Sequence, residues 1–168
     1  MKAIIDTNVL IAANGRDCPQ VTQNCRAKTI EFLQDFRKEG VIVLDNQWLI
    51  IKEYKHKVNS TGQPGIGDAF LKWILTNLAN LQRCQQIKVH PLGDYKFAEF
   101  PDDPELEKFD LSDRKFVAVA LAHPEHPPII NAVDTDWLEF EIPLSKNGIN
   151  IKFLCRDLVI SLLKNKNK

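Results

Sequence analysis

Short apolar runs alternate with amphipathic segments along most of the chain. The runs with the length and composition of buried strands are 3–5, 41–44, 87–90, 128–133 and 149–154. Alternation of strands with helical segments is typical of a parallel sheet that is covered by helices on both faces. The pattern therefore predicts an α/β fold with a central parallel sheet of about five strands. We expect one domain over residues 1–168, with a short basic tail at 164–168.

Helices are predicted between these runs from the spacing of apolar residues and from capping residues. The first predicted helix passes through 9–11, and the second runs from a cap at Thr22 to Gly40. The third begins after a cap at Asp45 or Asn46 and ends at about Val58, and the fourth spans 68–83. The fifth spans 113–122 after a cap at Ser112, and the last follows residue 154. Residues 60–67 are predicted to form a flexible loop. Residues 93–111 are predicted to form a loop or a partly helical excursion.

Composition excludes several classes of protein. With 44% hydrophobic and 26% charged residues, the chain has an ordinary globular composition, and it contains no apolar run long enough to span a membrane. An acid at position 6 comes too early for a secretory signal, so we expect a cytoplasmic protein with no membrane contact. The four cysteines have no metal-binding spacing, and we expect them to be reduced thiols.

The net charge of zero conceals an asymmetry between the two parts of the chain. Residues 1–98 contain 13 Lys and Arg against 9 Asp and Glu, whereas residues 99–168 contain 9 against 13. Many of the acids lie in 99–113, where they face only Lys108. The overall charge therefore gives no argument for nucleic-acid binding, and a polyanionic substrate would need local basic groups or a cation.

Several carboxylates occupy unusual positions relative to the apolar pattern. Asp6 and Asp134 each follow a predicted buried strand, where ligands bind in open α/β sheets, although helix capping is an alternative for either residue alone. Asp113 shares a helical face with Phe116 and Val117, and a carboxylate aimed at the core is costly unless it is paired or binds a metal.

Two further acids are candidates for the same group. Glu53 lies on the edge of an apolar helix face, with an ion pair to Lys57 as the alternative interpretation. Asp136 is either a further ligand or a surface acid. Such a set contains only oxygen ligands, which suit Mg²⁺ or Mn²⁺ rather than zinc. Clustered carboxylates around such an ion support attack of water on a phosphate ester.

Four motifs in this order resemble those of the PIN-domain nucleases, which are metal-dependent ribonucleases often found as toxins of bacterial toxin–antitoxin pairs. The motifs are 4–11 (IIDTNVLI), 50–54 (IIKEY), 111–120 (LSDRKFVAVA) and 132–137 (AVDTDW). Each motif is weak alone, but the ordered set covers residues 4 to 137.

The resemblance implies a PIN-like three-layer sandwich and a metal-dependent endoribonuclease. Asp6, Glu53, Asp113 and Asp134 would be the catalytic residues and hold one or two Mg²⁺ or Mn²⁺ ions, with Asp136 as an auxiliary ligand. Thr7 and Asn8 would support the site through hydrogen bonds. Water would cleave an RNA phosphodiester and leave a 5′-phosphate. The family often forms homodimers and is often inhibited by an antitoxin, so both are partners that the resemblance implies.

Lys52, Lys55 and Lys57, together with His56, are candidate contacts for the RNA backbone, with a solvated helix face as the alternative. A non-catalytic RNA- or protein-binding scaffold that retains the acids is the alternative to an enzyme. A phosphatase that uses an aspartyl-phosphate ranks lower, because its chemistry needs a second Asp where this chain has Asn8.

Overall fold

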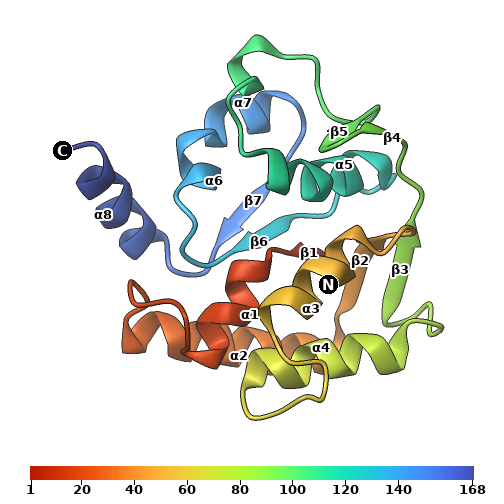
Figure 1. Ribbon diagram of the computed structural model, residues 1–168, viewed down its shortest axis with the longest axis vertical. Helices are drawn as coiled ribbons and strands as arrows, with labels where there is room; N and C mark the ends of the chain where they lie inside the picture. Colours follow the sequence, from red (N-terminus) through yellow and green to blue (C-terminus); the bar gives the residue numbers. More distant parts are fainter.

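A computed structural model describes all residues, 1–168, and has a parallel sheet between two layers of helices (Figure 1). The strands are β1 (Lys2–Ile5), β2 (Val41–Asp45), β3 (Cys84–Ile87), β4 (Pro91–Gly93), β5 (Lys96–Phe97), β6 (Ile129–Asn131) and β7 (Ile151–Phe153). The helices are α1 (Thr7–Asn14), α2 (Gln23–Glu39), α3 (Leu49–Lys57), α4 (Ile66–Asn77), α5 (Arg114–Ala122), α6 (Asp136–Glu139), α7 (Glu141–Lys146) and α8 (Arg156–Lys166), with 3₁₀ turns η1 (Pro104–Leu106) and η2 (Leu111–Asp113).

The main sheet has five strands in the order β3-β2-β1-β6-β7, and every neighbouring pair is parallel. The prediction of a central parallel sheet of about five strands flanked by helices is confirmed. In Figure 1, α1, α2 and α4 lie on one side of the sheet, and α5, α6 and α7 lie on the other. The chain builds β1, β2 and β3 outward in one direction and then returns to β6 beside β1. The strand order therefore reverses at β1, and ligands of open α/β sheets bind at such reversals.

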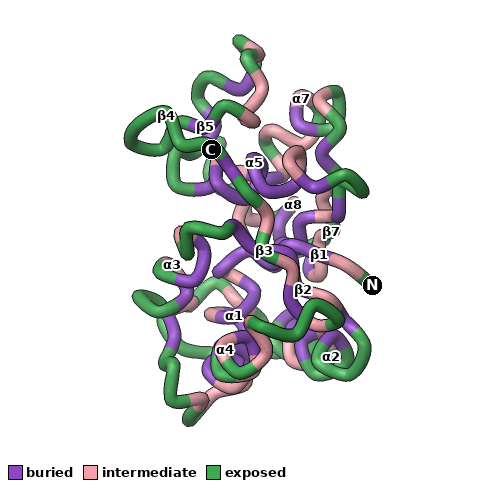
Figure 2. Tube along the Cα trace, turned by 90° about the vertical axis from the view of Figure 1, so that its right-hand side faces the viewer, coloured by how far each residue is buried: buried purple, intermediate pink, exposed green.

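The strands near the middle of the sheet are buried on both faces, as their continuous apolar sequences require. Ile4, Ile42 and Ile130 have no exposed surface, and they belong to one cluster of buried residues that extends into helices on both sides. Figure 2 shows this distribution, with buried segments along the sheet and exposed segments at the outer loops. None of the helices is long and apolar enough to cross a membrane.

Two predicted elements lie at other positions along the chain. The helix predicted at 68–83 is α4, which ends at Asn77, and the strand predicted at 87–90 is β3, at Cys84–Ile87. Leu81 continued the apolar spacing of the helix, but it is 75% exposed in a turn. β3 is an edge strand, so its sequence contains Gln85 and Gln86 and lacks the apolar pattern of the inner strands.

The structure selects Asp45 from the two predicted caps of α3 and contradicts the predicted cap of α5. Asp45 is the acid that caps α3, because its carboxylate accepts hydrogen bonds from the backbone N–H groups of Leu49 and Ile50, each at 2.9 Å. Ser112 does not cap α5: it lies inside η2, which Asp110 caps, and Asp113 occupies the N-cap position of α5.

The cysteine prediction is wrong for two of the four residues. Cys25, in the first turn of α2, forms a disulfide with Cys155, which directly precedes α8, and their Cα atoms are 5.5 Å apart. Cys18 and Cys84 are free thiols, as expected. Because 130 positions separate the bonded pair, no local spacing motif marks it.

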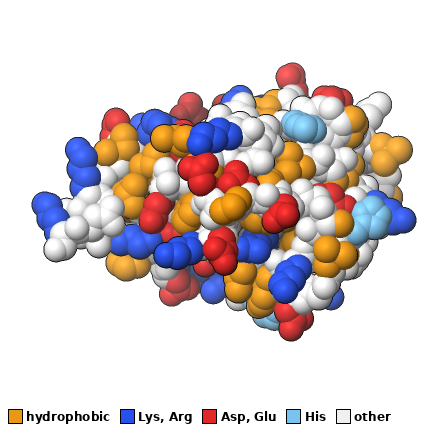
Figure 3. Space-filling view, turned by 90° about the horizontal axis from the view of Figure 1, so that it is seen from above, with side chains coloured by type: hydrophobic (Ala, Val, Ile, Leu, Met, Phe, Trp, Pro, Cys, Tyr) orange, Lys and Arg blue, Asp and Glu red, His pale blue; other side chains and the backbone are white.

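The predicted excursion at 93–111 and its neighbouring residues form a hairpin followed by two 3₁₀ turns. Residues 91–97 form the antiparallel hairpin β4–β5, and η1 and η2 follow. Several of its acids are used internally: Glu99 accepts from the backbone N–H of His90, Asp103 caps η1 and Asp110 caps η2. On the face seen in Figure 3, acidic side chains alternate with basic and apolar ones, so this face has no continuous basic surface.

Candidate metal centre

Three aspartates from distant parts of the sequence meet at the carboxyl edge of the sheet. Asp6 directly follows β1, Asp134 lies three residues after β6, and Asp113 ends η2 above them. One carboxylate oxygen from each lies within 4.8 Å of the other two. The strand reversal at β1 brings Asp6 and Asp134 together, and the start of α5 supplies Asp113.

Asp113 is the least satisfied member of the group. It is 6% exposed, and its carboxylate accepts no hydrogen bond from any protein donor. Burying an ionised carboxylate without a partner is costly, so such groups in proteins are paired, protonated or bound to a metal. This confirms the predicted burial of Asp113 and leaves its charge without a compensating donor within the protein.

Asp6 is held firmly in place by its neighbours. Its Oδ1 accepts from the backbone N–H of Asn8 at 2.8 Å, and its Oδ2 accepts from Trp137 Nε1 at 2.5 Å. Trp137 is completely buried, which fixes the orientation of the indole N–H. Two donors on opposite oxygens therefore determine the orientation of the Asp6 carboxylate.

Asp134 is positioned by the loop that follows β6. Its Oδ1 accepts from the backbone N–H of Asp136 at 2.9 Å. Its own backbone N–H donates to Asn131 Oδ1 at 3.2 Å, and its carbonyl accepts from Asn131 Nδ2 at 2.8 Å. Asn131 also receives a hydrogen bond from Asn8 Nδ2 at 2.7 Å, so an asparagine pair ties the loops after β1 and β6 together.

The protonation equilibria of the three aspartates reflect their burial and mutual repulsion. Burial, followed by the charge of Asp134, raises the pKa of Asp6 to about 7. Burial, followed by the charges of Asp6 and Asp134, raises the pKa of Asp113 to about 10. Burial also raises the pKa of Asp134 above its usual range. A cation among the three groups would offset this repulsion.

The donor set fits a hard divalent cation. It consists only of carboxylate oxygens, the ligands that Mg²⁺ and Mn²⁺ prefer, with no His or Cys among them. Asp113, buried and without a donor, points to a missing positive partner. The residues present therefore fit such an ion, which Asp6, Asp113 and Asp134 would hold.

Compared with protein-family models, with curated proteins and with solved structures, the chain matches none of them. The interpretation of the site therefore depends on its own geometry.

Glu53, predicted as a fourth ligand, does not join the three aspartates. Its Oε2 forms an ion pair with Lys115 Nζ, and its Oε1 accepts from the hydroxyl of Thr7. The alternative ion pair with Lys57 is absent as well. The reason is the position of Lys115, which is only 9% exposed and forms its ion pair with Glu53 on α3.

The other predicted site residues, Asp136, Thr7 and Asn8, lie next to the cluster but make contacts that differ from the predicted ones or support it only through the backbone. Asp136 forms an ion pair with Lys166 at 2.9 Å and contributes its backbone N–H, not its carboxylate, to Asp134. Thr7 supports Glu53 and not the aspartates. The side-chain oxygen of Asn8 accepts from the backbone N–H groups of Ala132 and Val133, at 2.8 and 3.2 Å.

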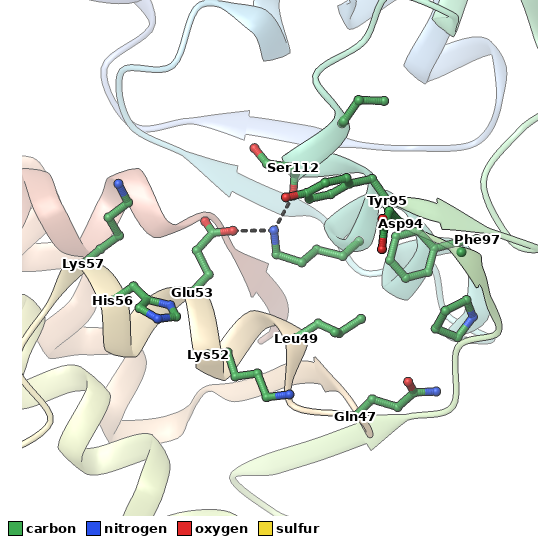
Figure 4. Close-up of a pocket in the computed structure, with 14 residues that line it drawn as sticks. Gln47, Leu49, Lys52, Glu53, His56, Lys57, Asp94, Tyr95, Phe97 and Ser112 are labelled. Carbon is green, nitrogen blue, oxygen red and sulfur yellow. Dashed lines mark hydrogen bonds and ion pairs between the residues drawn. The ribbon is translucent and has the colours of Figure 1, made fainter.

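A pocket of about 840 Å³ opens beside this site, between α3 and the hairpin β4–β5 (Figure 4). Lys52, Glu53 and Lys57 line it from α3, and Tyr95 lines it from the hairpin. Lys52 and Lys57 make no ion pair, so their charges are available to a ligand. Lys55 does not line the pocket, and its ammonium lies over the Trp48 ring, 5.7 Å from the centroid.

Three residues of the site were missed from the sequence: Trp137, Asn131 and Lys115. Asn131 had a detectable signal, because a polar residue inside the apolar run 128–133 is unusual in a buried strand. Trp137 followed Asp134 and Asp136 closely, but nothing in the pattern indicated that its N–H donates to Asp6. Lys115 had no signal, since its partner Glu53 lies 62 positions earlier.

Proposed function

We propose that the chain is a metal-dependent endoribonuclease of the PIN-like type that hydrolyses RNA phosphodiesters at the three-aspartate site. The observation that carries the proposal is Asp113, a buried carboxylate without a donor that lies within 4.8 Å of two other carboxylates. Mg²⁺ or Mn²⁺ bound by these residues would make water a better nucleophile and neutralise charge on the phosphate.

The residues of this chain have separable roles in the proposal. Trp137 and the backbone of Asn8 fix the Asp6 carboxylate, and the Asn8–Asn131 pair sets its distance from Asp134. Preorganised ligands of this kind avoid reorganisation during the reaction. Lys52 and Lys57 at the adjacent pocket would attract the phosphates on either side of the cleaved bond.

The test is cleavage of a labelled single-stranded RNA, beside a DNA of the same sequence, with Mn²⁺, Mg²⁺ or EDTA. We expect wild-type protein to cut the RNA with either metal, leaving 5′-phosphate ends, and not with EDTA. Asp113→Asn should lower the rate roughly 1,000-fold, because it removes a ligand whose charge supports several kcal/mol of transition-state stabilisation. Asp102→Asn, at an exposed acid outside the cluster, is the matched control.

Cleavage that persists in Asp113→Asn or in EDTA would contradict the proposal. RNA binding by a protein that binds Mn²⁺ but cuts no substrate would support the scaffold alternative instead. The homodimer and the antitoxin partner that the resemblance implies stay predictions.

A further inference from the structure

Lys115 brings a buried positive charge to the border of the three-aspartate site. It lies in the first turn of α5, two residues after Asp113, and only 10% of its side chain is exposed. Its ammonium pairs with Glu53 Oε2, donates to the carbonyl of Ser112, and lies 4.8 Å from the centroid of the Phe116 ring. The dashed lines of Figure 4 mark the bonds at Glu53 and Ser112.

We propose that the Lys115 ammonium is a resident cation that keeps Glu53 out of the metal's coordination shell, so that the three aspartates hold a single divalent ion. This inference rests on the proposed metal centre and specifies its stoichiometry and its ligands. It departs from the family resemblance, which implies Glu53 as a ligand.

Both oxygens of Glu53 already have partners. The Thr7 hydroxyl donates to Oε1, and Lys115 holds Oε2 from the opposite helix. Binding of a metal by Glu53 would compete with both partners, and Lys115 would lose part of the carboxylate charge that compensates its own. Breaking one side of a buried ion pair is strongly unfavourable, because the other charge is left uncompensated.

Electrostatic repulsion also disfavours a second ion beside Glu53. Lys115 lies two residues after Asp113, and Thr7, which donates to Glu53, directly follows Asp6, so both side chains border the cluster. A second divalent ion beside Glu53 would face this ammonium at short range, and like charges in a poorly solvated place repel strongly. The ammonium of Lys115 therefore supplies positive charge beside the cluster without a second ion.

The Lys115–Glu53 pair is also placed between two packed helices. Glu53 is on α3, Lys115 is on α5, and the two helices contact each other beside the pocket. The pair therefore forms part of the pocket wall next to the aspartates. Two of the three ammonium N–H groups are used by Glu53 and Ser112, which fixes the direction of the side chain.

The experiment is Mn²⁺ titration followed by calorimetry for affinity and by electron paramagnetic resonance for the number of bound ions. Wild type should bind one ion, and Glu53→Gln should change the dissociation constant less than about 3-fold. In a Lys115→Met background, Glu53 is free to bind the metal, so Glu53→Gln should then weaken binding by about 10-fold or more. Lys52→Met, another lysine at the same pocket, is the metal-affinity control.

Two results would overturn the inference: two ions bound by wild type, or a loss of about 10-fold or more from Glu53→Gln in the wild-type background. The single variant decides this even if Lys115→Met does not fold. Absence of any Mn²⁺ binding by folded wild-type protein would have a different meaning, since it would contradict the metal centre itself and with it the proposed function.

Discussion

Two groups of buried aspartates in this protein differ in what surrounds their oxygens. Asp45 and Asp68 are completely buried, as deeply as Asp6 and Asp113. The Asp45 carboxylate accepts three backbone N–H groups, those of Gln47, Leu49 and Ile50, all at 2.9 Å. Asp113 accepts no hydrogen bond. Burial is therefore shared by both groups, and the supply of donors separates them.

Asp68 is a buried carboxylate whose two oxygens are both supplied with hydrogen-bond donors. Its oxygens accept from the backbone N–H groups of Asn59 and Gly65 at 2.7 and 2.8 Å, from Asn14 Nδ2 at 2.8 Å, and from Arg16 at 3.0 Å. Burial alone would raise its pKa, but these donors together lower the pKa below its usual value. The shifts at Asp6 and Asp113 have the opposite direction. Asp6 accepts two hydrogen bonds and Asp113 accepts none, against three at Asp45 and four at Asp68. The structural carboxylates of this fold therefore have more donors than the candidate ligands.

Asp113→Asn is the variant that most directly tests whether Asp113 differs from the structural acids. We expect Mn²⁺ affinity to fall at least about 100-fold, because one of three charged ligands is lost. We also expect the metal-free protein to gain about 2 kcal/mol in the free energy of unfolding near pH 7, because the folded state no longer holds an acid whose pKa is raised far above its value in the unfolded chain. Calorimetric titration and urea denaturation in EDTA measure the two effects. A loss of metal-free stability would place Asp113 with the structural acids.

At Asp68, the corresponding change to Asn should lower the free energy of unfolding instead of raising it. Asp68→Asn replaces a charged acceptor with an amide that turns two hydrogens toward existing donors. We expect a loss of about 3 kcal/mol in the free energy of unfolding, with Mn²⁺ affinity unchanged in the folded protein. Urea denaturation measures the loss. Unchanged stability would show that the donor count does not predict the role of a buried acid.

The pH dependence of the metal-free protein follows from the cluster. The folded-state pKa values of Asp6 and Asp113, about 7 and about 10, lie above the usual 3.8. The folded protein then binds more protons than the unfolded chain, so stability falls as pH rises from about 4 through 7 and on toward 10. Melting temperatures in EDTA across this range test the slope. Adding Mn²⁺ above pH 7 should restore stability, and a metal-free melting temperature that rises with pH would contradict the assignment.

The smallest effect is expected at Asp136, next to the cluster in sequence. Its carboxylate pairs with Lys166 at 2.9 Å on the surface, and its backbone N–H is what contacts Asp134. Asp136→Asn should therefore change stability by about 0.5 kcal/mol or less and Mn²⁺ affinity by less than about 3-fold. Denaturation and calorimetry are again the measurements. A larger loss of affinity would return Asp136 to the ligand set.

Elements with strong local patterns were predictable from the sequence. The apolar runs before Asp6 and Asp134 are β1 and β6, and their parallel pairing explains why acids 128 positions apart could be expected at one edge. The burial of Asp113 followed from its position relative to Phe116 and Val117. In each case the signal lies within a few residues, where periodicity carries information.

Features that depend on distant partners were not predictable. The Cys25–Cys155 bond, the Lys115–Glu53 pair and the Trp137–Asp6 hydrogen bond each join segments that only the tertiary fold brings together. The disulfide contradicts the expectation of four reduced thiols, and such bonds persist mainly in oxidising surroundings. The strand β3 was predicted three residues too late, at 87–90, for a related reason. Its glutamines interrupt the apolar pattern, and they are tolerated because β3 lies at the edge of the sheet.

The hydrogen bond from Trp137 to Asp6 gives the site a built-in optical reporter. The indole is completely buried and its N–H contacts a carboxylate of the cluster at 2.5 Å, whereas the other two tryptophans, Trp48 and Trp73, lie elsewhere and are partly exposed. Indole emission depends on the charge and hydrogen bonding of its surroundings. Occupation or protonation of the Asp6 carboxylate should therefore appear in the intrinsic fluorescence of the unlabelled protein, and the signal should disappear in Trp137→Phe.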